Sequence, residues 1–498
     1  MLLIRIRGQA AQLPARGPGL AWYTTRSGHN KPLGLQQGRH ETSISPGTAA
    51  RLEITHRHHH PPPKASVAGT SPPRVKLAQR IRHTATSVTR AFLPTDYKTS
   101  VTPEYIGYTK WQFFHNVLGS ASGVLSTQAM LYAMGLGVGS LPLSAAINWV
   151  IKDGFGQLGG VVYATMVGQK FDSDPKHQRF WSAVWLQSAT WLEMMTPLFP
   201  HMFLLVGSVA NIGKNISWLA MSATKASINK TFCLKENLGD LTAKHGSQAT
   251  AAGLMGTALG VLIGATMDVS INTLIVGFVP ISLASLWGNY KSLLYTITPT
   301  LNVARAHHML GDAIEVRNGE LRLDPLRLKT PKQVSDVERF MHQTHHIEAH
   351  KSYPRIAISP DIHRLTSRFG LARPATNPDS SKVAAMIAEA FQVRDPALAE
   401  KYYIGTLASP AAAGGSTIYL WFDKKAESSD ILLGFYEALA LRKLLGTAAG
   451  ISIDAARTQA HLFARQTFAA TRKSVTENGW DMSIMYFAKQ SSLVEVKH

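Results

Sequence analysis

The segment ATAAGLMGTALGVLIGATM, residues 249–267, contains no charged residue and repeats glycine at every fourth position. Gly256, Gly260 and Gly264 would therefore share one face of a helix, where the absence of side chains lets a second helix approach closely. The uncharged run also approaches the length of about 20 residues that crosses a membrane. The segment predicts a helix packed through glycine and a mainly α-helical fold around it.

Other long apolar windows flank this segment. Residues 117–151 and 269–290 contain no charge, and residues 180–212 carry Glu193 as their only acidic residue. Windows of this length favour two to five membrane helices, and a soluble all-helical core is the alternative. We therefore predict a Gly-rich, multi-helix, membrane-associated domain at residues 91–302.

The chain changes character after residue 302, because charge density rises and apolar residues begin to alternate with polar ones. Residues 401–407 and 416–422 predict two strands with a Gly-containing connection. Residues 428–445 predict an amphipathic helix, and residues 453–473 predict a second helix. This pattern is typical of a small soluble α+β domain, which we assign to residues 303–498.

The first 90 residues are strongly basic. They hold 14 Lys and Arg but only two acids, a net charge of +12 (14 − 2), whereas the whole chain carries +20. An Arg- and Ser-rich, acid-poor segment without an apolar core predicts a plastid or mitochondrial transit peptide and a linker; a disordered basic tail is the alternative. Residues 75–92 could form a short basic amphipathic helix. Since no basic module with interleaved aromatic residues follows, no nucleic-acid partner is expected.

Two charged segments interrupt the apolar region, WVIKDGFGQLGG at residues 149–160 and GQKFDSDPK at residues 168–176. Ionisable groups in apolar surroundings are costly to desolvate, so they are kept when paired, hydrated or functional. Lys152 and Asp153 are neighbours that do not face each other on a helix, so we expect each to have a partner elsewhere. One interpretation is a set of structural ion pairs, and the other is a polar cavity for a small anionic or zwitterionic metabolite.

The candidate ligand-binding residues are the polar and charged side chains in or beside the apolar windows. They are Lys152, Asp153, Asp172, Asp174, Lys176, Glu193, Asn211, Lys214, Ser247 and Gln248. Lys152 and Lys176 would supply the cations. Ser247 could cap the glycine-rich helix, whose free backbone N–H groups would then bind an anion; capping alone is the alternative. For Glu193, Asn211 and Lys214 the alternative is hydrogen bonding between helices.

The sequence contains no nucleophile elbow, phosphate-binding Walker loop, HExxH motif or CxxC pair, so no catalytic residue, cofactor or metal is predicted. The single cysteine, Cys233, excludes a disulfide within the chain. On a helix, His342, His346 and His350 would share one face with His345 beside it, and we prefer a solvated helix surface to a zinc site there.

A series of short motifs occurs in order along residues 92–305. They include FLPTDYKTSVTPEYIGYTKWQ (92–112), GVLSTQAML (123–131), the two charged segments, SATKA (222–226), NLGDLTAKHGSQ (237–248) and LNVAR (301–305). This series resembles the root UVB sensitive (RUS) family of membrane-associated proteins. The chain departs from the family pattern at Gly160 and Lys225, where the family usually has Arg, and at His245, where an acidic residue is common.

The resemblance implies a protein linked to UV-B responses and vitamin B6 homeostasis in a plastid or other membrane, without established catalytic residues. We therefore expect a non-enzymatic organelle membrane protein that binds, transports or scaffolds a small metabolite. A homo- or hetero-oligomer with another family member is a further expected assembly. The alternatives are a membrane-embedded metal-dependent enzyme that uses Asp153, Asp172, Asp174 or Glu193, and a protein-interaction scaffold.

Overall fold

The computed structural model describes residues 90–135, 143–166, 170–266, 271–342, 346–350, 352–360, 401–408, 416–447 and 450–487. All of them belong to one compact unit, Pro72–His498. The predicted transit peptide and linker lie outside the described residues, as does the predicted helix at residues 75–92 except for its last three residues. The transit peptide therefore stays a prediction.

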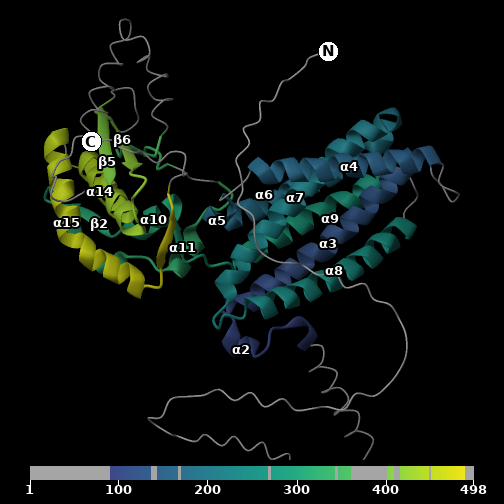
Figure 1. Ribbon diagram of the computed structural model, residues 1–498, viewed down its shortest axis with the longest axis horizontal. Coiled ribbons are helices and arrows are strands. Elements are labelled where there is room, and N and C mark those ends of the chain that lie inside the picture. Colours follow the sequence, from purple (N-terminus) through teal and green to yellow (C-terminus); the bar gives the residue numbers. More distant parts are fainter. Residues whose placement is uncertain are drawn as a thin grey trace, which may run out of the picture. The chain divides into compact units, whose positions relative to one another are not determined.

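Helices, most of them 20 to 30 residues long, form the region between residues 90 and 300 (Figure 1). They are α2 (Tyr97–Ser100), α3 (Glu104–Ala133), α4 (Leu143–Met166), α5 (Lys170–Ser173), α6 (Pro175–Met194), α7 (Phe203–Phe232), α8 (Leu238–Thr266) and α9 (Ile271–Leu293), with short 3-10 turns η1 (Thr196–Leu198) and η2 (Pro200–Met202). Pro197 and Pro200 divide the apolar window at residues 180–212, because proline cannot continue a helix, and α6 and α7 form on either side.

Helix α3 is the centre of this bundle. Helices α8 and α9 pack along it, α6 contacts both α3 and α9, α7 pairs with α6, and α4 packs on α7. Gly256, Gly260 and Gly264 of α8 are buried against α3. A Cβ atom at Gly256 would lie 2.1 Å from the carbonyl oxygen of Val117, so the two backbones approach closely only because glycine is present.

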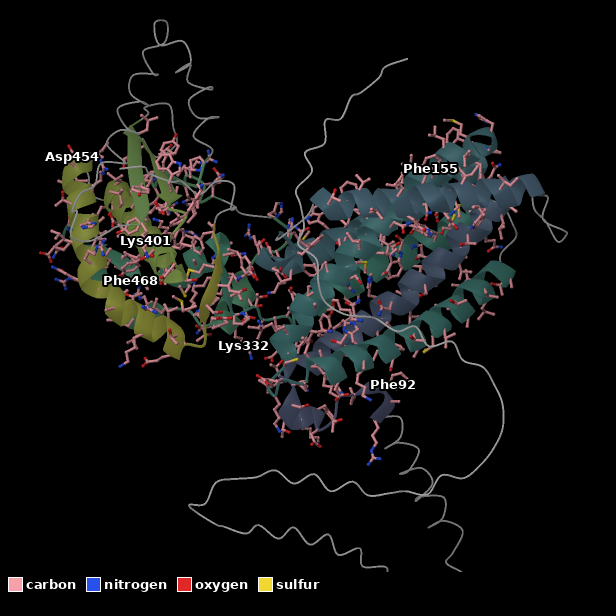
Figure 2. The ribbon with its side chains drawn as sticks, viewed as in Figure 1. Phe92, Phe155, Lys332, Lys401, Asp454 and Phe468 are labelled. Atoms are coloured by element: carbon pink, nitrogen blue, oxygen red, sulfur yellow. The ribbon has the colours of Figure 1, made fainter. Side chains whose placement is uncertain are left out.

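The outer surface of the bundle carries large apolar side chains. Val150 and Leu158 on α4 and Leu254 and Leu262 on α8 are 60–71% exposed, and Phe155 also projects from α4 (Figure 2). Among the described helices, α8 alone is long and apolar enough to cross a membrane, judged by length and composition. The described part of the chain thus gives fewer such helices than the two to five expected.

The α+β region follows the bundle in the sequence. Its elements are β1 (Thr300–Asn302), α10 (Val303–Leu310), β2 (Ile314–Arg317), β3 (Glu320–Leu323), η3 (Pro325–Arg327), α11 (Pro331–Val337), β4 (Arg355–Ile358), β5 (Tyr402–Ala408), β6 (Ser416–Phe422), α14 (Ser428–Thr447), α15 (Ile453–Glu477) and β7 (Asp481–Tyr486). Strand β6 lies between β4, which is parallel to it, and β5, which is antiparallel. Strands β2 and β3 form a hairpin, and β1 pairs in parallel with β7.

The strands and helices predicted for this region are confirmed, with ends that differ by a few residues. Helix α14 is not amphipathic, however. It is buried over most of its surface, since the sheet, β2, β7 and α15 all pack against it. The described histidines of this stretch, His342, His346 and His350, do not share a helix face, because Ile347 and His350 form β-bridges with Ile356 and Tyr353. His345 lies outside the described residues.

Candidate functional site

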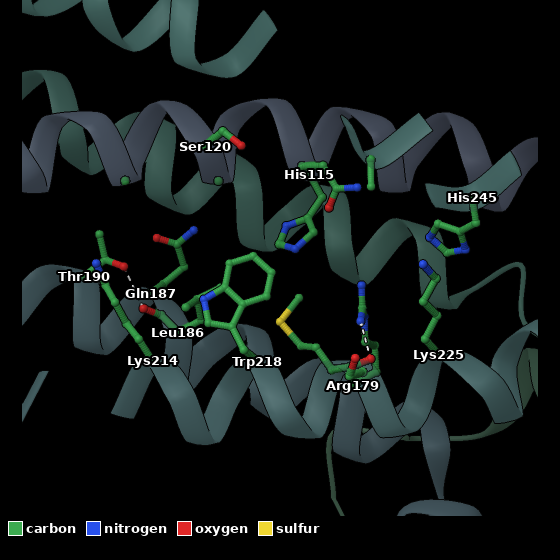
Figure 3. A pocket seen from close by; sticks show the side chains of 16 residues that line it. His115, Ser120, Arg179, Leu186, Gln187, Thr190, Lys214, Trp218, Lys225 and His245 are labelled. Atoms are coloured by element: carbon green, nitrogen blue, oxygen red, sulfur yellow. Dashed lines mark hydrogen bonds between the residues drawn. The ribbon is translucent and has the colours of Figure 1, made fainter. Parts of the chain in front are cut away.

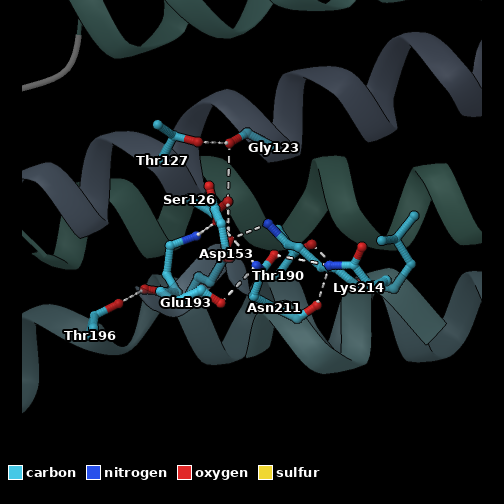
Figure 4. A network of polar contacts seen from close by, with 12 residues as sticks. Gly123, Ser126, Thr127, Asp153, Thr190, Glu193, Thr196, Asn211 and Lys214 are labelled. Atoms are coloured by element: carbon cyan, nitrogen blue, oxygen red, sulfur yellow. Dashed lines mark hydrogen bonds and ion pairs between the residues drawn. The ribbon is translucent and has the colours of Figure 1, made fainter. Parts of the chain in front are cut away.

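The first charged segment forms a local ion pair within α4 (Figure 4). Lys152 Nζ lies 2.6 Å from Asp153 Oδ1, so the expectation that these neighbours need separate partners is wrong. The lysine stem passes over Gly207 of α7 and places its ammonium group 4.7 Å from the centroid of the Trp149 ring. Asn211 donates hydrogen bonds of 3.1 Å to both the Lys152 carbonyl oxygen and Asp153 Oδ1. These residues therefore tie α4 to α7.

Glu193 and Lys214 form a second ion pair, between α6 and α7 (Figure 4). The Glu193 carboxylate also accepts a 3.0 Å hydrogen bond from Ser126 Oγ of α3. Glu193 is buried and Lys214 is partly exposed. This arrangement joins three helices and neutralises one lysine charge.

The second charged segment lies at the contact between the bundle and the α+β region. Lys176 Nζ donates to Ser335 Oγ at 2.7 Å and to Glu338 Oε2 at 2.8 Å. Arg305 lies 3.1 Å from the other oxygen of Glu338, and all three charged side chains are at most 5% exposed. Burial alone would raise the pKa of Glu338, but Lys176 and Arg305 outweigh it and hold the pKa below its ordinary value. Lys176 is thus a structural cation.

Three other predicted site residues also serve the fold. Asp174 is the N-cap of α6 and accepts from the His177 N–H at 3.4 Å, while its burial raises its pKa. Asp172 accepts a 2.6 Å hydrogen bond from Ser227 Oγ. Gln248 donates to the Phe92 carbonyl oxygen at 2.6 Å.

The expectation that Ser247 caps the glycine-rich helix is wrong. Helix α8 begins at Leu238, nine residues earlier, so Ser247 lies inside it and donates its hydroxyl to the Ala243 carbonyl oxygen at 3.3 Å. Its backbone N–H is part of the helix and is not available to an anion.

The three aspartates considered as metal ligands contact different partners. Among the residues that the structure describes, no group of three or more His, Cys, Asp or Glu side chains is placed to hold a metal ion. Asp153 faces Asn211, Asp172 faces Ser227, and Asp174 caps α6.

A cavity of about 350 Å³ lies between α3, α6, α7 and α8 (Figure 3). This volume is at the lower end of the usual range for small-molecule sites, roughly 300–1,000 Å³. Its lining includes His115, Arg179, Lys214, Trp218, Lys225 and His245. None of the 16 lining residues is an aspartate or a glutamate. The cavity is therefore polar and cationic, and we call it the cationic pocket.

Two of its cations have no acidic partner among the described residues. The Arg179 side chain is 6% exposed, its Nη1 donates to the Met221 carbonyl oxygen at 2.9 Å, and its Nε has no hydrogen-bond partner in this part of the chain. Burial lowers the pKa of Arg179, and burial together with Arg179 lowers the pKa of Lys225. Since buried cations are costly without an anion, a bound anion would stabilise this arrangement.

The two histidines of the pocket are neutral at pH 7. His115 Nδ1 lies 2.9 Å from the Ser285 carbonyl oxygen, and burial lowers its pKa to about 4. His245 Nδ1 lies 3.1 Å from Asn229 Oδ1, and burial together with Lys225 and Arg179 lowers its pKa to about 3. Because an amide oxygen accepts, the proton of His245 is on Nδ1, and Nε2 is left as an acceptor.

Among the residues of this pocket, Lys214 was a predicted site residue, whereas Arg179, Lys225 and His115 were not. One signal was available in α6, where Arg179, Ser182, Gln187 and Thr190 follow at helical intervals and all are buried. A buried polar stripe on a helix indicates either contacts between helices or a polar cavity. It does not indicate which of these applies until the neighbouring helices are placed.

A protein-family model described as "Vitamin B6 photo-protection and homoeostasis domain" matches residues 78–316, a range that contains the whole cationic pocket. Several curated root UVB sensitive proteins also match the chain. The chain belongs to the root UVB sensitive family.

Root UVB sensitive 4 of Arabidopsis thaliana is 35% identical over 265 residues, which cover 52% of this chain and 48% of that protein. Root UVB sensitive 3 of the same plant is 29% identical over 264 residues, covering 53% of this chain and 58% of its own length. RUS family member 1 of Dictyostelium discoideum is 30% identical over 254 residues, which cover 50% of this chain and 47% of that protein. The chain thus spans about half the length of these relatives. No solved structure matches it.

Two of the three departures from the RUS pattern line the cationic pocket. Lys225 and His245 come from α7 and α8 and face each other across it (Figure 3). Gly160 lies instead against Asn215, at the contact of α4 with α7. The pocket of this RUS protein thus contains a lysine and a neutral histidine at positions where the family resemblance led us to expect an arginine and an acid.

Proposed function

We propose that this protein binds a small phosphorylated aromatic metabolite of the vitamin B6 group in the cationic pocket, as a non-enzymatic protein of B6 homeostasis. The observation that carries the proposal is the pair of cations, Arg179 and Lys225, that face a cavity without any acidic lining residue. The description of the matching family domain supports the choice of vitamin. UV-B response is the wider setting that the names of the relatives suggest.

The chemistry of the lining matches such a ligand. A guanidinium group forms paired hydrogen bonds with phosphate oxygens, and a lysine adds a point charge. Trp218 offers an aromatic surface at the edge of the pocket, where a pyridine ring could stack. Lys214 contributes little net charge because Glu193 neutralises it.

Binding can be measured on the purified chain by equilibrium dialysis and thermal unfolding, with pyridoxine 5′-phosphate, pyridoxine and inorganic phosphate as ligands. We expect the phosphorylated vitamer to bind best. At about 100 times its Kd it should add about 2.7 kcal/mol to the free energy of unfolding. Arg179→Gln should weaken binding about tenfold or more, because a hydrogen bond to a charged group contributes about 1.5–3 kcal/mol.

Arg322→Gln is the matched control, since Arg322 is exposed on the β2–β3 hairpin, outside the pocket. It should bind the vitamer like the unaltered chain. Equal affinity of the chain and Arg179→Gln, or no binding of any phosphorylated vitamer, would refute the proposal.

A second candidate ligand is an amphiphilic phosphate. A groove of about 730 Å³ between α3 and α8 shares Ser120, Gly123 and Lys214 with the cationic pocket, and Leu131 and Val261 line it. A phosphate in the pocket could therefore continue into an apolar chain along the groove. A lysophospholipid that displaces pyridoxine 5′-phosphate, with a Kd well below that of glycerol 3-phosphate, would favour this candidate.

We also propose that the protein associates with an organelle membrane through the apolar outer faces of α4 and α8. The exposed Val150, Leu158, Leu254 and Leu262 support this association, and one relative is named chloroplastic. Carbonate extraction and protease protection of isolated plastids and mitochondria would test it. Complete release of the protein by carbonate would argue against a stable membrane anchor.

A further inference from the structure

Lys225 differs chemically from the other lysine of the cationic pocket. Lys214 forms an ion pair with Glu193. Lys225 has no ion pair among the described residues, is half-buried, and lies beside a second cation, Arg179. Desolvation and a neighbouring positive charge both favour the neutral amine, which is the nucleophilic form of lysine.

The backbone places this amine beside the anion-binding group. Arg179 donates to the carbonyl oxygen of Met221, which precedes Lys225 by four residues on α7. Residues four apart lie on one helix face about 6 Å apart along the axis, so the guanidinium and the amine face the same end of the pocket. Pyridoxal 5′-phosphate carries its phosphate and its aldehyde on neighbouring ring positions, which suits a phosphate held by Arg179 and an aldehyde near Lys225.

The neutral His245 provides a hydrogen-bond acceptor at the same end. Figure 3 shows the Lys225 side chain extending toward the His245 ring, and the hydrogen bond of Nδ1 to Asn229 leaves Nε2 unprotonated. Burial, Lys225 and Arg179 keep this imidazole neutral, with a pKa of about 3, so its Nε2 can accept a hydrogen bond from the Lys225 amine and orient that amine toward the pocket.

We propose that Lys225 forms a reversible Schiff base with an aldehyde ligand whose phosphate is bound by Arg179, namely pyridoxal 5′-phosphate. The Lys225 nitrogen adds to the aldehyde carbon, and the resulting carbinolamine loses water, which contains the aldehyde oxygen and the two amine protons. A C=N bond replaces the C=O bond, and no oxidant or reductant is needed. This inference rests on the proposed function, since it specifies how the same pocket would hold one B6 vitamer. The covalent bond would select the aldehyde vitamer over the alcohol and amine forms.

The test is reductive trapping followed by peptide mapping. The full chain is incubated with pyridoxal 5′-phosphate and reduced with borohydride, which adds hydride to the imine carbon and makes the link permanent. We expect the modification on Lys225. It should fall about tenfold when pyridoxine 5′-phosphate, which has no aldehyde, is present at about ten times its Kd. Pyridoxal without phosphate should label Lys225 much less.

Two variants separate the covalent step from phosphate binding. Lys225→Arg places a permanent cation at this position but offers no amine for a Schiff base. The variant should therefore still bind pyridoxine 5′-phosphate and should give no adduct at residue 225. Lys230→Arg changes an exposed lysine on the same helix and should give as much Lys225 adduct as the unaltered chain. Since the competition experiment uses the unaltered chain, it remains informative if Lys225→Arg does not fold.

Each outcome has one meaning. If pyridoxine 5′-phosphate binds but the unaltered chain gives no Lys225 adduct, the Schiff base is refuted and the proposed function stands. If labelling is spread over exposed lysines and the competitor does not reduce it, the Schiff base is also refuted. If no phosphorylated vitamer binds at all, both the inference and the proposed function fail.

Discussion

Replacing Glu338 with glutamine tests the buried charge cluster at the contact of the bundle with the α+β region. The substitution removes the one carboxylate that faces both Lys176 and Arg305, each only 1% exposed. Removing one partner of a buried ion pair typically costs about 3–5 kcal/mol. Arg305 keeps its hydrogen bonds to the Thr300 and Ser173 carbonyl oxygens, and Lys176 keeps its hydrogen bond to Ser335. We therefore expect the free energy of unfolding to decrease by about 3 kcal/mol, the lower end of that range.

Thermal and urea unfolding would measure this loss. Because the entropy of unfolding is about 2.1 cal/mol/K per residue, a decrease of about 3 kcal/mol corresponds to a fall in Tm of roughly 3–5 °C for a compact unit as long as Pro72–His498. The Glu338 pKa lies below its ordinary value, so its stabilising effect is complete above about pH 4.5 and is lost as the pH falls through the folded-state pKa. The Glu338→Gln chain should therefore lose less stability on acidification than the unaltered chain.

Glu320→Gln is the control, because the Glu320–Arg322 pair is 3.6 Å apart and mostly exposed, and such pairs contribute at most about 1 kcal/mol. The loss of stability in Lys176→Met should lie between those of Glu338→Gln and Glu320→Gln, because Glu338 keeps its ion pair with Arg305. If Glu338→Gln unfolds within about 1 kcal/mol of the unaltered chain, the cluster does not stabilise this contact as argued.

Two further predictions concern the bundle. Gly256→Ala should destabilise the chain by about 1–3 kcal/mol in urea unfolding, because the added Cβ would overlap the backbone of α3. Gly246→Ala is the control: nothing lies within 4 Å of its added Cβ, so it should stabilise the chain by about 0.5–1 kcal/mol. Equal effects of the two substitutions would contradict the close contact between α8 and α3. Burial lowers the pKa of His115 from 6.5 to about 4 in the folded chain. As the pH falls, the unfolded chain therefore takes up this proton before the folded chain does, and the free energy of unfolding should decrease by up to about 3 kcal/mol between pH 6.5 and 4. His115→Gln should make that fall smaller, and an unchanged pH profile would argue against a neutral buried His115.

The secondary structure of the α+β region could be predicted because its signals are local. Alternating residues mark β5 and β6, and Ser452, whose side chain accepts from the Ala455 N–H, marks the start of α15. The start of α8 was missed for a local reason too. Gly239 and Gly246 suggest a loop, yet packing against α3 and α7 keeps this stretch helical.

The candidate site could not be predicted because it depends on contacts between distant segments. Arg179 and Lys225 lie 46 residues apart (225 − 179), and the sequence around each gives no sign that the two side chains share a cavity. The pairing of Lys152 with Asp153 was missed for a different reason. The rule that adjacent helix residues do not face each other concerns the Cβ directions, and a lysine stem is long enough to bend back when Gly207 leaves space for it.

Because β1 pairs in parallel with β7, it cannot complete this pairing until β7 has been synthesised. Strand β7 begins 179 residues after β1 ends (481 − 302). At about 5–20 residues per second, the ribosome needs roughly 9–36 seconds to cover that interval. During this interval the bundle that precedes β1 is already fully synthesised, but β1 itself lacks its neighbouring strand, β7. A nascent chain paused before residue 481 would therefore present an open strand edge to chaperones, even when all the residues of the cationic pocket have already emerged.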